Sequence, residues 1–325
     1  MSIEMLSTEQ RIIMQQLVQF NQLYQVHSDE WSLLSEIPQN SVKITLFAEL
    51  ELVRQVTAFT SLEKSLVSSP VFRLVKRDNT FFWEIFSESS DVNDICQKTK
   101  DSEFDFICWP QGVDKPPKLI LFDMDSTFIQ IEVIDQLAAR HNVGEKVAKV
   151  TEAAMQGKLD FAESLVSRVA CLQGLNEAAI DDIAQSLPLS PGIPQLVEAA
   201  AKNNCYIAIV SGGFTPFVEK LKKELSLYKV KANVLEIESG QLTGKVLGSI
   251  VDAKAKAEFL SSLCEELELA NSEVMAIGDG ANDLLMMNEA GFNLAYHAKP
   301  TVQAQAKGRI EHTSFSLLPV VFGWS

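Results

Sequence analysis

The sequence predicts an α/β protein built on a parallel sheet, and two aspartate clusters carry that prediction. The first cluster, residues 122–127 (Phe-Asp-Met-Asp-Ser-Thr), directly follows the apolar run 118–121. The second, residues 278–283 (Gly-Asp-Gly-Ala-Asn-Asp), directly follows the apolar run 274–277. Short apolar runs that end at turn residues are typical of buried parallel strands. Because ligands bind at the carboxyl ends of such strands, both clusters should lie at one edge of the sheet.

The composition and charge are those of a soluble globular chain of two or three domains. The 325 residues are 46% apolar and 22% charged, and 28 basic against 43 acidic side chains give a net charge of −15. This charge argues against nucleic acid and anionic membranes as partners, since both require clustered Lys and Arg. A small anionic substrate stays compatible with it, because a bound cation reverses the local field.

The five cysteines are scattered and form no C-x-x-C pair, which predicts free thiols in a reducing cytoplasm. A zinc site or a catalytic cysteine is the alternative. The first residues, Met-Ser-Ile-Glu, lack the layout of a signal peptide, and no apolar run has the length of a membrane span. We therefore expect a cytoplasmic protein that does not bind membranes.

Residues 1–110 are predicted to form a small α+β N-terminal domain without a catalytic constellation. The periodicity indicates helices at 9–26 and 50–66 and strands at 43–48, 71–75 and 80–86, with a hairpin turn at Asp78-Asn79. Residues 110–117, which contain prolines, a glycine and charges, continue neither a helix nor a central strand and are predicted to be a linker.

Residues 111–325 are predicted to form the second domain, in which strands and helices alternate. A helical insert at about 130–190 interrupts the sheet, with helices expected at 132–141, 145–156, 160–173 and 177–185. The sheet resumes with a strand at 206–210, and residues 230–237 and 242–247 are expected to pair as a hairpin around Ser239-Gly240.

The aspartate clusters can carry out phosphoryl transfer. Asp123 can attack phosphorus as a nucleophile and form an aspartyl-phosphate. Since a phosphate monoester repels a carboxylate, a cation is needed, and Mg²⁺ prefers oxygen ligands such as Asp123, the backbone carbonyl of Asp125 and the side chain of Asp279. The side chain of Asp125 is then available as general acid and base.

Two further motifs supply partners for phosphate oxygens. Ser211 and the amides that follow it come at a strand end before a helix, where they can donate hydrogen bonds, and Lys256 on a predicted helix adds positive charge. Each motif alone is typical of a solvated loop or helix surface. Their order along the chain, strand–Asp-x-Asp, strand–Ser, helix–Lys and strand–Gly-Asp-Gly, favours one shared site.

From residue 118 to about residue 312, the chain resembles phosphatases of the haloacid-dehalogenase (HAD) superfamily, and more narrowly the phosphoserine phosphatase family. Residues 122–127 with Glu132 are similar to the first motif of that family. Residues 155–161 followed by Arg168 are similar to its cap segment, and residues 279–283 and 295–300 are similar to its last motif and the strand after it. The resemblance covers roughly three fifths of the chain. It implies a HAD-like Rossmannoid parallel sheet with an inserted helical cap.

The resemblance also implies an activity, Mg²⁺-dependent hydrolysis of O-phospho-L-serine to L-serine and phosphate through an aspartyl-phosphate, the last step of L-serine biosynthesis. By the same resemblance, Asp279 is a metal ligand, Asp283 supports the metal, and Asn282 lies near the phosphate. The phosphate is held by Ser211, Gly212 and Lys256, and the serine moiety is enclosed by Glu132, Met155, Phe161 and Arg168. Arg168 can bind the substrate carboxylate through its guanidinium fork, and Glu132 can pair with the ammonium.

Several alternatives stay open at this stage. Lys254 competes with Lys256 as the phosphate ligand, and the cap can select another small phosphomonoester or D-phosphoserine. Two rival classes of protein are a regulatory protein with a relic phosphatase fold and a D-x-D glycosyltransferase. The first is opposed by the catalytic positions, which are all filled. The second leaves residues 278–283 unexplained. For the N-terminal domain, an ACT-like module that regulates the enzyme or forms a homodimer is suggested by fold-level analogy alone.

Overall fold

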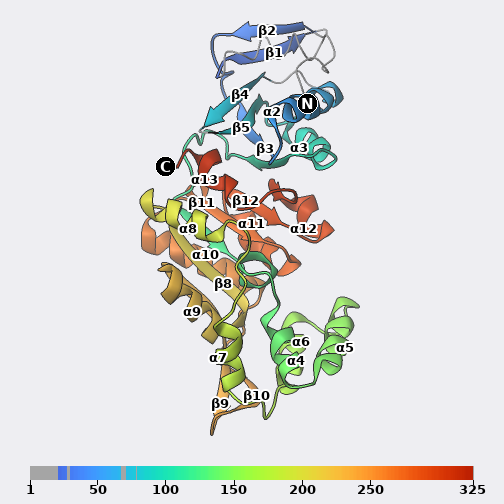
Figure 1. The fold of residues 1–325 in the computed structure, drawn as a ribbon, viewed down its shortest axis with the longest axis vertical. Coiled ribbons are helices and arrows are strands. Elements are labelled where there is room, and N and C mark those ends of the chain that lie inside the picture. The colour runs from blue at the N-terminus through green and yellow to red at the C-terminus, as the bar shows by residue number, and fades with distance from the viewer. Residues whose placement is uncertain (1–20, 28–29, 67–70, 78, 325) are drawn as a thin grey trace.

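The computed structural model describes residues 21–27, 30–66, 71–77 and 79–324. Figure 1 shows an elongated molecule with the N-terminal unit at one end, the inserted helices at the other and the sheet between them. In the described part of the chain, the strands join in one 13-stranded sheet. From one edge to the other they are β10 (Gln241–Leu247), β9 (Lys229–Glu238), β8 (Tyr206–Phe214), β7 (Leu119–Phe122), β11 (Val274–Gly278), β12 (Phe292–Tyr296), β13 (Gly308–Ile310), β6 (Asp105–Cys108), β3 (Val42–Phe47), β5 (Thr80–Ser87), β4 (Val71–Arg77), β1 (Leu23–His27) and β2 (Glu30–Leu34).

The parallel part of the sheet confirms the predicted α/β class. Strand β7 pairs in parallel with β8 and β11, and β11 pairs in parallel with β12. All four residues of β7 are buried, and they alternate between the two faces: Ile120 and Phe122 belong to one apolar core, Leu119 and Leu121 to another. Both faces are therefore covered, as the uninterrupted apolar run requires.

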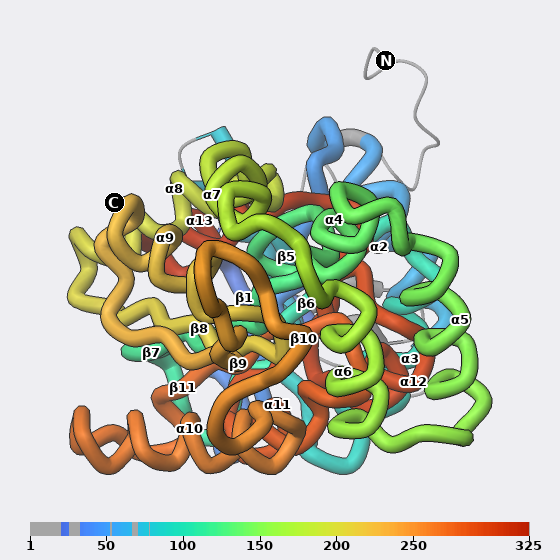
Figure 2. The backbone as a smooth tube through the Cα atoms, turned by 90° about the horizontal axis from the view of Figure 1, so that it is seen from below, coloured from blue at the N-terminus to red at the C-terminus, as the bar shows by residue number. Residues whose placement is uncertain are grey.

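Helices form the two outer layers and the insert (Figure 2). The face of Leu119 is covered by α10 (Ala253–Leu267), α11 (Leu284–Glu289) and α12 (Pro300–Gln305), and the face of Ile120 by α8 (Ile193–Lys202), α9 (Thr215–Leu225) and α13 (Leu317–Phe322). The insert comprises α4 (Val133–Arg140), α5 (Gly144–Met155), α6 (Phe161–Ala170) and α7 (Ala178–Ala184). Its four helices lie where the sequence predicts them, and β9 and β10 pair as the predicted hairpin.

The N-terminal unit differs from the prediction in several elements. Residues 23–26 lie in strand β1, so the helix predicted for 9–26 is wrong there, and the first part of that helix, residues 9–20, lies outside the described residues. Helix α2 (Leu52–Ser65) and strands β3, β4 and β5 are confirmed. The turn position 78 is outside the described residues, while β4 and β5 pair antiparallel as a hairpin requires. Strands β2 and β6 and helix α3 (Val92–Lys100) were not predicted.

The N-terminal unit and the rest of the chain share the sheet, because β6 pairs antiparallel with β13. Two buried charged side chains join them. Asp105 of β6 accepts hydrogen bonds from the backbone amides of residues 311–313, at 2.8–3.0 Å for the shortest bond to each. Arg309 of β13 donates to the carbonyls of Thr99, Lys100 and Phe104 at 2.9–3.2 Å. The predicted linker, residues 110–117, thus connects two units that are also joined by the pairing of β6 with β13 and by these hydrogen bonds.

Two other features of the described chain bear on the sequence predictions. None of its helices combines the length and the apolar character that a membrane span requires. The five cysteines are free thiols, and four of them are buried.

Candidate active site

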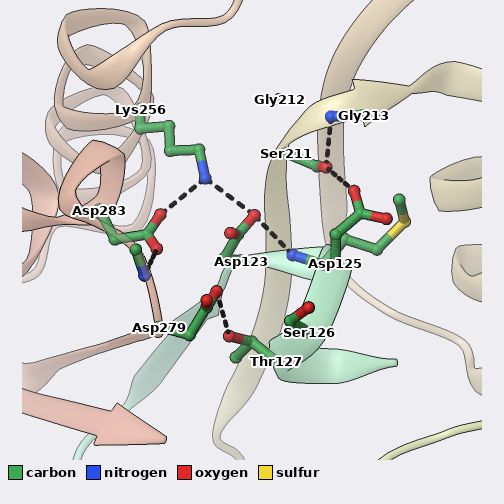
Figure 3. Close-up of polar contacts among 12 residues, drawn as sticks. Asp123, Asp125, Ser126, Thr127, Ser211, Gly212, Gly213, Lys256, Asp279 and Asp283 are labelled. Atoms are coloured by element: carbon green, nitrogen blue, oxygen red, sulfur yellow. Dashed lines mark hydrogen bonds and ion pairs between the residues drawn. The ribbon is translucent and has the colours of Figure 1, made fainter. Parts of the chain in front are cut away.

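The first aspartate cluster lies in an irregular turn directly after β7. Asp123 follows the strand in an extended conformation, and residues Met124–Phe128 form one irregular helical turn. Ser126 has a φ of 56°, in the left-handed region that few residues other than glycine adopt. This turn sends Asp123 and Asp125 to different neighbours: Asp123 faces Lys256 and Asp125 faces Ser211 (Figure 3).

Lys256 of α10 lies between two carboxylates in the floor of the site. Its side chain is fully buried, and Nζ lies 2.8 Å from Oδ1 of Asp123 and 2.6 Å from Oδ1 of Asp283. Burial lowers the pKa of Lys256, but its two carboxylate partners raise it more, so the side chain is protonated at neutral pH. Asp283 is fixed further by the backbone amide of Gly280, which donates to its Oδ2 at 3.0 Å.

Three carboxylates converge beside Lys256 and form a candidate metal site. Single oxygens of Asp123, Asp279 and Asp283 all lie within 4.8 Å of one another. Burial and then the nearby Asp283 raise the pKa of Asp123 well above its usual value, and the same two causes raise the pKa of Asp279 to about 6. One ammonium does not balance three carboxylates, and oxygen donors of this kind suit a divalent cation. The donor set therefore fits a divalent metal.

Asp125 is held in a different environment from Asp123. The backbone amide of Val133 donates to its Oδ1 at 2.8 Å, and the hydroxyl of Ser211 donates to its Oδ2 at 3.4 Å. Burial, followed by the negative charge of Glu132, raises the pKa of Asp125 to about 7. A carboxyl group with this pKa exchanges a proton near neutral pH, as a general acid and base must.

Cap residues close the site from the other side. A pocket of about 370 Å³ lies between the aspartate turn, the Gly212-Gly213 segment and the cap. Its lining includes Asp123, Asp125, Glu132, Phe161, Arg168, Gly212, Asp279, Asn282 and Lys299. A Cβ on Gly212 would lie 2.8 Å from the ring of Phe161, so a larger residue here would displace that ring from its close contact with the core.

The structure brings most of the predicted site residues together, although Ser211, Lys256, Asp283 and Met155 do not line the pocket itself. Ser211 and Lys256 lie buried directly beneath its floor, bonded to Asp125 and Asp123 respectively. Met155 is 82% exposed at the end of α5 and does not line the pocket, so its role in enclosing the substrate stays a prediction. Lys254 is 80% exposed and pairs with Glu258, so of the two lysines that the sequence left open it is Lys256 that contacts the aspartates.

Two further side chains belong to the site without having been assigned a role from the sequence. The hydroxyl of Thr127 donates to Oδ1 of Asp279 at 3.4 Å and so connects the two aspartate clusters. The side chain of Lys299 lines the pocket, and its charge lowers the pKa of Asp279. Both residues stand in segments that the sequence motifs include, Thr127 in the first and Lys299 in the last, but the spacing alone does not say which way they face.

Comparison with known proteins agrees with this geometry. The family model for haloacid dehalogenase-like hydrolases matches residues 117–291, more than half of the chain. The chain is 50% identical over 191 residues (59% of its length) to the phosphoserine phosphatase of Vibrio cholerae serotype O1, and 48% identical over 188 residues (58%) to that of Idiomarina loihiensis. These alignments span 58% of the Vibrio protein and 86% of the Idiomarina protein.

A solved structure extends the similarity to the N-terminal unit. The HAD family hydrolase t0658 from Salmonella enterica serovar Typhi superposes with a TM-score of 0.79 at 28% identity, covering 87% of this chain and 99% of that one. The chain belongs to the haloacid dehalogenase-like hydrolases and, within them, to the phosphoserine phosphatase family.

Proposed function

We propose that this protein hydrolyses O-phospho-L-serine to L-serine and phosphate, with Mg²⁺ as its metal. The observation that supports this substrate best is the charge distribution in the pocket. Glu132 and Arg168 line its cap side, while Asp123 and Asp125 line its floor. A phosphate bound at the floor leaves a negative and a positive side chain for the ammonium and the carboxylate of a serine moiety.

The metal would be held by Asp123 and Asp279, with the carbonyl of Asp125 as a third ligand and Asp283 in support. When bound, Mg²⁺ neutralises phosphate charge and so permits a carboxylate to approach phosphorus. Mg²⁺ suits the site because it prefers carboxylate and carbonyl oxygens and retains several waters.

The reaction proceeds in two steps at Asp123. A carboxylate oxygen of Asp123 forms a bond to phosphorus as the bond to the serine oxygen breaks, and Asp125 gives its proton to that oxygen. Serine leaves, and Asp125, now a carboxylate, takes a proton from water. The resulting hydroxide attacks phosphorus, the Asp123–phosphorus bond breaks, and phosphate is released with Asp125 protonated again. The pKa of Asp125, about 7, suits both directions of proton transfer.

The chain's own groups hold the phosphate during both steps. Lys256 keeps Asp123 in place by a 2.8 Å contact, Ser211 and Gly212 lie near the end of β8, and Asn282 lines the pocket. A cytoplasmic location, and regulation or homodimerisation through the N-terminal unit, are further predictions from composition and analogy.

A substrate panel tests the proposal. Phosphate release should be fastest from O-phospho-L-serine, slower from phosphothreonine and slowest from sugar phosphates, and it should stop when EDTA removes the metal. Asp123→Asn should abolish turnover, because an amide does not attack phosphorus, while its circular dichroism spectrum stays that of the wild type. A sugar phosphate hydrolysed faster than phosphoserine would replace the substrate assignment and leave the phosphatase mechanism in place.

A further inference from the structure

The strand β8 carries an irregularity at the residues proposed to bind phosphate. Val210 of β8 pairs with Lys231 of β9, and Phe214 pairs with Asn233. Four residue steps on β8 thus correspond to two on β9, so that Ser211, Gly212 and Gly213 lie opposite the single residue Ala232. Such a bulge interrupts the ladder, so its backbone groups require other partners to keep one shape.

The side chain of Asn233 supplies such a partner. It is 1% exposed, and its Nδ2 donates to the carbonyl oxygen of Gly212 at 2.8 Å. Its Oδ1 accepts from the backbone amide of Val251 at 2.8 Å. A carbonyl requires a donor and an amide N–H requires an acceptor, so these two partners determine the orientation of the Asn233 amide.

The bond to Gly212 sets the direction of the next amide as well. In a planar trans peptide the C=O and the following N–H point in opposite directions. With the Gly212 carbonyl directed to Asn233, the Gly213 N–H is directed the other way, where it donates to the hydroxyl oxygen of Ser211 at 2.8 Å. That hydroxyl in turn donates to Oδ2 of Asp125 at 3.4 Å. The side-chain amide of Asn233 therefore orients the Gly213 N–H, the Ser211 hydroxyl and, through that hydroxyl, the carboxylate of Asp125.

The second bond of Asn233 reaches the element that carries Lys256. Val251 directly precedes Asp252, the N-cap of α10, whose side chain accepts from the amide of Ala255 at 2.8 Å. Lys256 is the fourth residue of that helix. Asn233 thus connects the bulge at the end of β8 to the start of α10, the two elements that face the phosphate in the proposed function.

We propose that Asn233 is a positioning residue for the phosphoryl group: it holds the 211–213 bulge and the start of α10 in the relation that phosphate binding requires. This inference rests on the proposed phosphatase function but not on the choice of serine as substrate. It concerns the phosphate end of the pocket, because the side-chain bonds of Asn233 lead to Gly212 and Val251.

Asn233→Asp tests this role with almost no change of shape. The carboxylate still accepts from Val251, but it cannot donate to Gly212, and its oxygen would face the carbonyl oxygen. We expect kcat/KM to fall roughly ten- to hundredfold for phosphoserine and by the same factor for p-nitrophenyl phosphate, as for the loss of one buried hydrogen bond. The inhibition constant of inorganic phosphate should rise by a similar factor, whereas that of L-serine should not change.

Asn293→Asp is the matched control. Asn293 on β12 is also buried and also accepts from a backbone amide, that of Lys307, but this bond leads neither to the 211–213 bulge nor to the start of α10. It should retain wild-type kinetics. If Asn233→Asp does not fold, as judged by circular dichroism, Asn233→Ser provides the same comparison with a smaller polar side chain.

Three results would overturn the proposal. They are wild-type phosphate affinity in both Asn233 variants, an equal loss in Asn293→Asp, and a parallel weakening of L-serine inhibition that indicates general damage to the fold.

Failure of the substrate assignment is recognised separately, by a wild-type protein that hydrolyses p-nitrophenyl phosphate but not phosphoserine. In that case the p-nitrophenyl phosphate and inorganic phosphate measurements still decide the role of Asn233. Should the wild type hydrolyse neither compound, calorimetric titration of inorganic phosphate makes the same comparison.

Discussion

The ammonium of Lys256 lies 2.8 Å from Oδ1 of Asp123 in a site where the lysine side chain is completely buried. Its other partner, Asp283, is buried equally. The lysine is therefore a structural counter-ion as well as a proposed phosphate ligand, and its removal leaves buried carboxylates without a partner.

Lys256→Met should lower the free energy of unfolding of the metal-free protein by about 3–5 kcal/mol, the cost of breaking a buried ion pair. A divalent metal should recover part of this loss, because it binds the same carboxylates. Urea unfolding with EDTA and with Mg²⁺ measures both effects. Lys254→Met is the control: that side chain is 80% exposed in a surface pair with Glu258, and we expect a change below about 1 kcal/mol. Equal effects of the two variants would contradict the assignment of Lys256.

Asp279→Asn should weaken metal binding, because the amide replaces a charged oxygen ligand at the site where three carboxylates converge. Calorimetric titration with Mg²⁺ measures the affinity independently of activity. Asp182→Asn, a change at an exposed aspartate that pairs with Arg140 on the surface, should leave the affinity unchanged. An unaltered Mg²⁺ affinity in Asp279→Asn would exclude Asp279 as a ligand.

Arg168→Ala should discriminate between substrates. We expect it to cost about 2–4 kcal/mol of transition-state binding for phosphoserine, as for truncating one partner of a buried charge pair. The cost should be much smaller for p-nitrophenyl phosphate, which has no carboxylate. The ratio of kcat/KM values for the two substrates measures this difference. Arg140→Ala, on the same cap but paired with Asp182 at the surface, should change neither value. Equal losses on both substrates in Arg168→Ala would refute its role in recognising serine.

Glu132→Gln should alter the pH dependence of the reaction. Burial and then the charge of Glu132 raise the pKa of Asp125 to about 7, and Asp125 must be protonated to protonate the leaving group. Activity is therefore lost as the pH rises through that pKa. Without the charge of Glu132 the pKa falls, so the alkaline limb of the kcat/KM profile should move to lower pH. Glu145→Gln, an exposed cap carboxylate, should leave the limb in place. A limb that moves to higher pH in Glu132→Gln would contradict this electrostatic role.

Asp105→Asn should destabilise the contact between the N-terminal unit and the rest of the chain. Asp105 is fully buried and accepts from the amides of residues 311–313 and from the hydroxyl of Thr313 at 2.8 Å. An asparagine would direct its NH₂ group at donors, and we expect a loss of about 2–3 kcal/mol in urea unfolding. Glu88→Gln, an exposed change in the same unit, is the control. Wild-type stability in Asp105→Asn would show that these bonds contribute little.

Local sequence determined the strands and the reactive groups. The apolar runs before Asp123 and Asp279 become β7 and β11 because a run buried on both faces suits only a central strand. Parallel pairing then brings both aspartates to the same edge. The helical insert was predictable for a similar reason, since its 3.6-residue periodicity is a property of neighbouring residues.

The tertiary structure alone decided which way individual side chains face and how distant segments join. Lys254 and Lys256 are about 200° apart around a helix, and only packing against the sheet places Lys256 inside. Met155 and Phe161 are both apolar residues of the predicted cap segment, yet Met155 is exposed and Phe161 contacts the core at Gly212. Residues 23–26 became a strand through pairing with β2 and β4, and β6 joined β13 across some 200 residues. The hydrogen bonds of Asn233 have the same origin: they join segments far apart in the chain, and local periodicity contains no information about such partners.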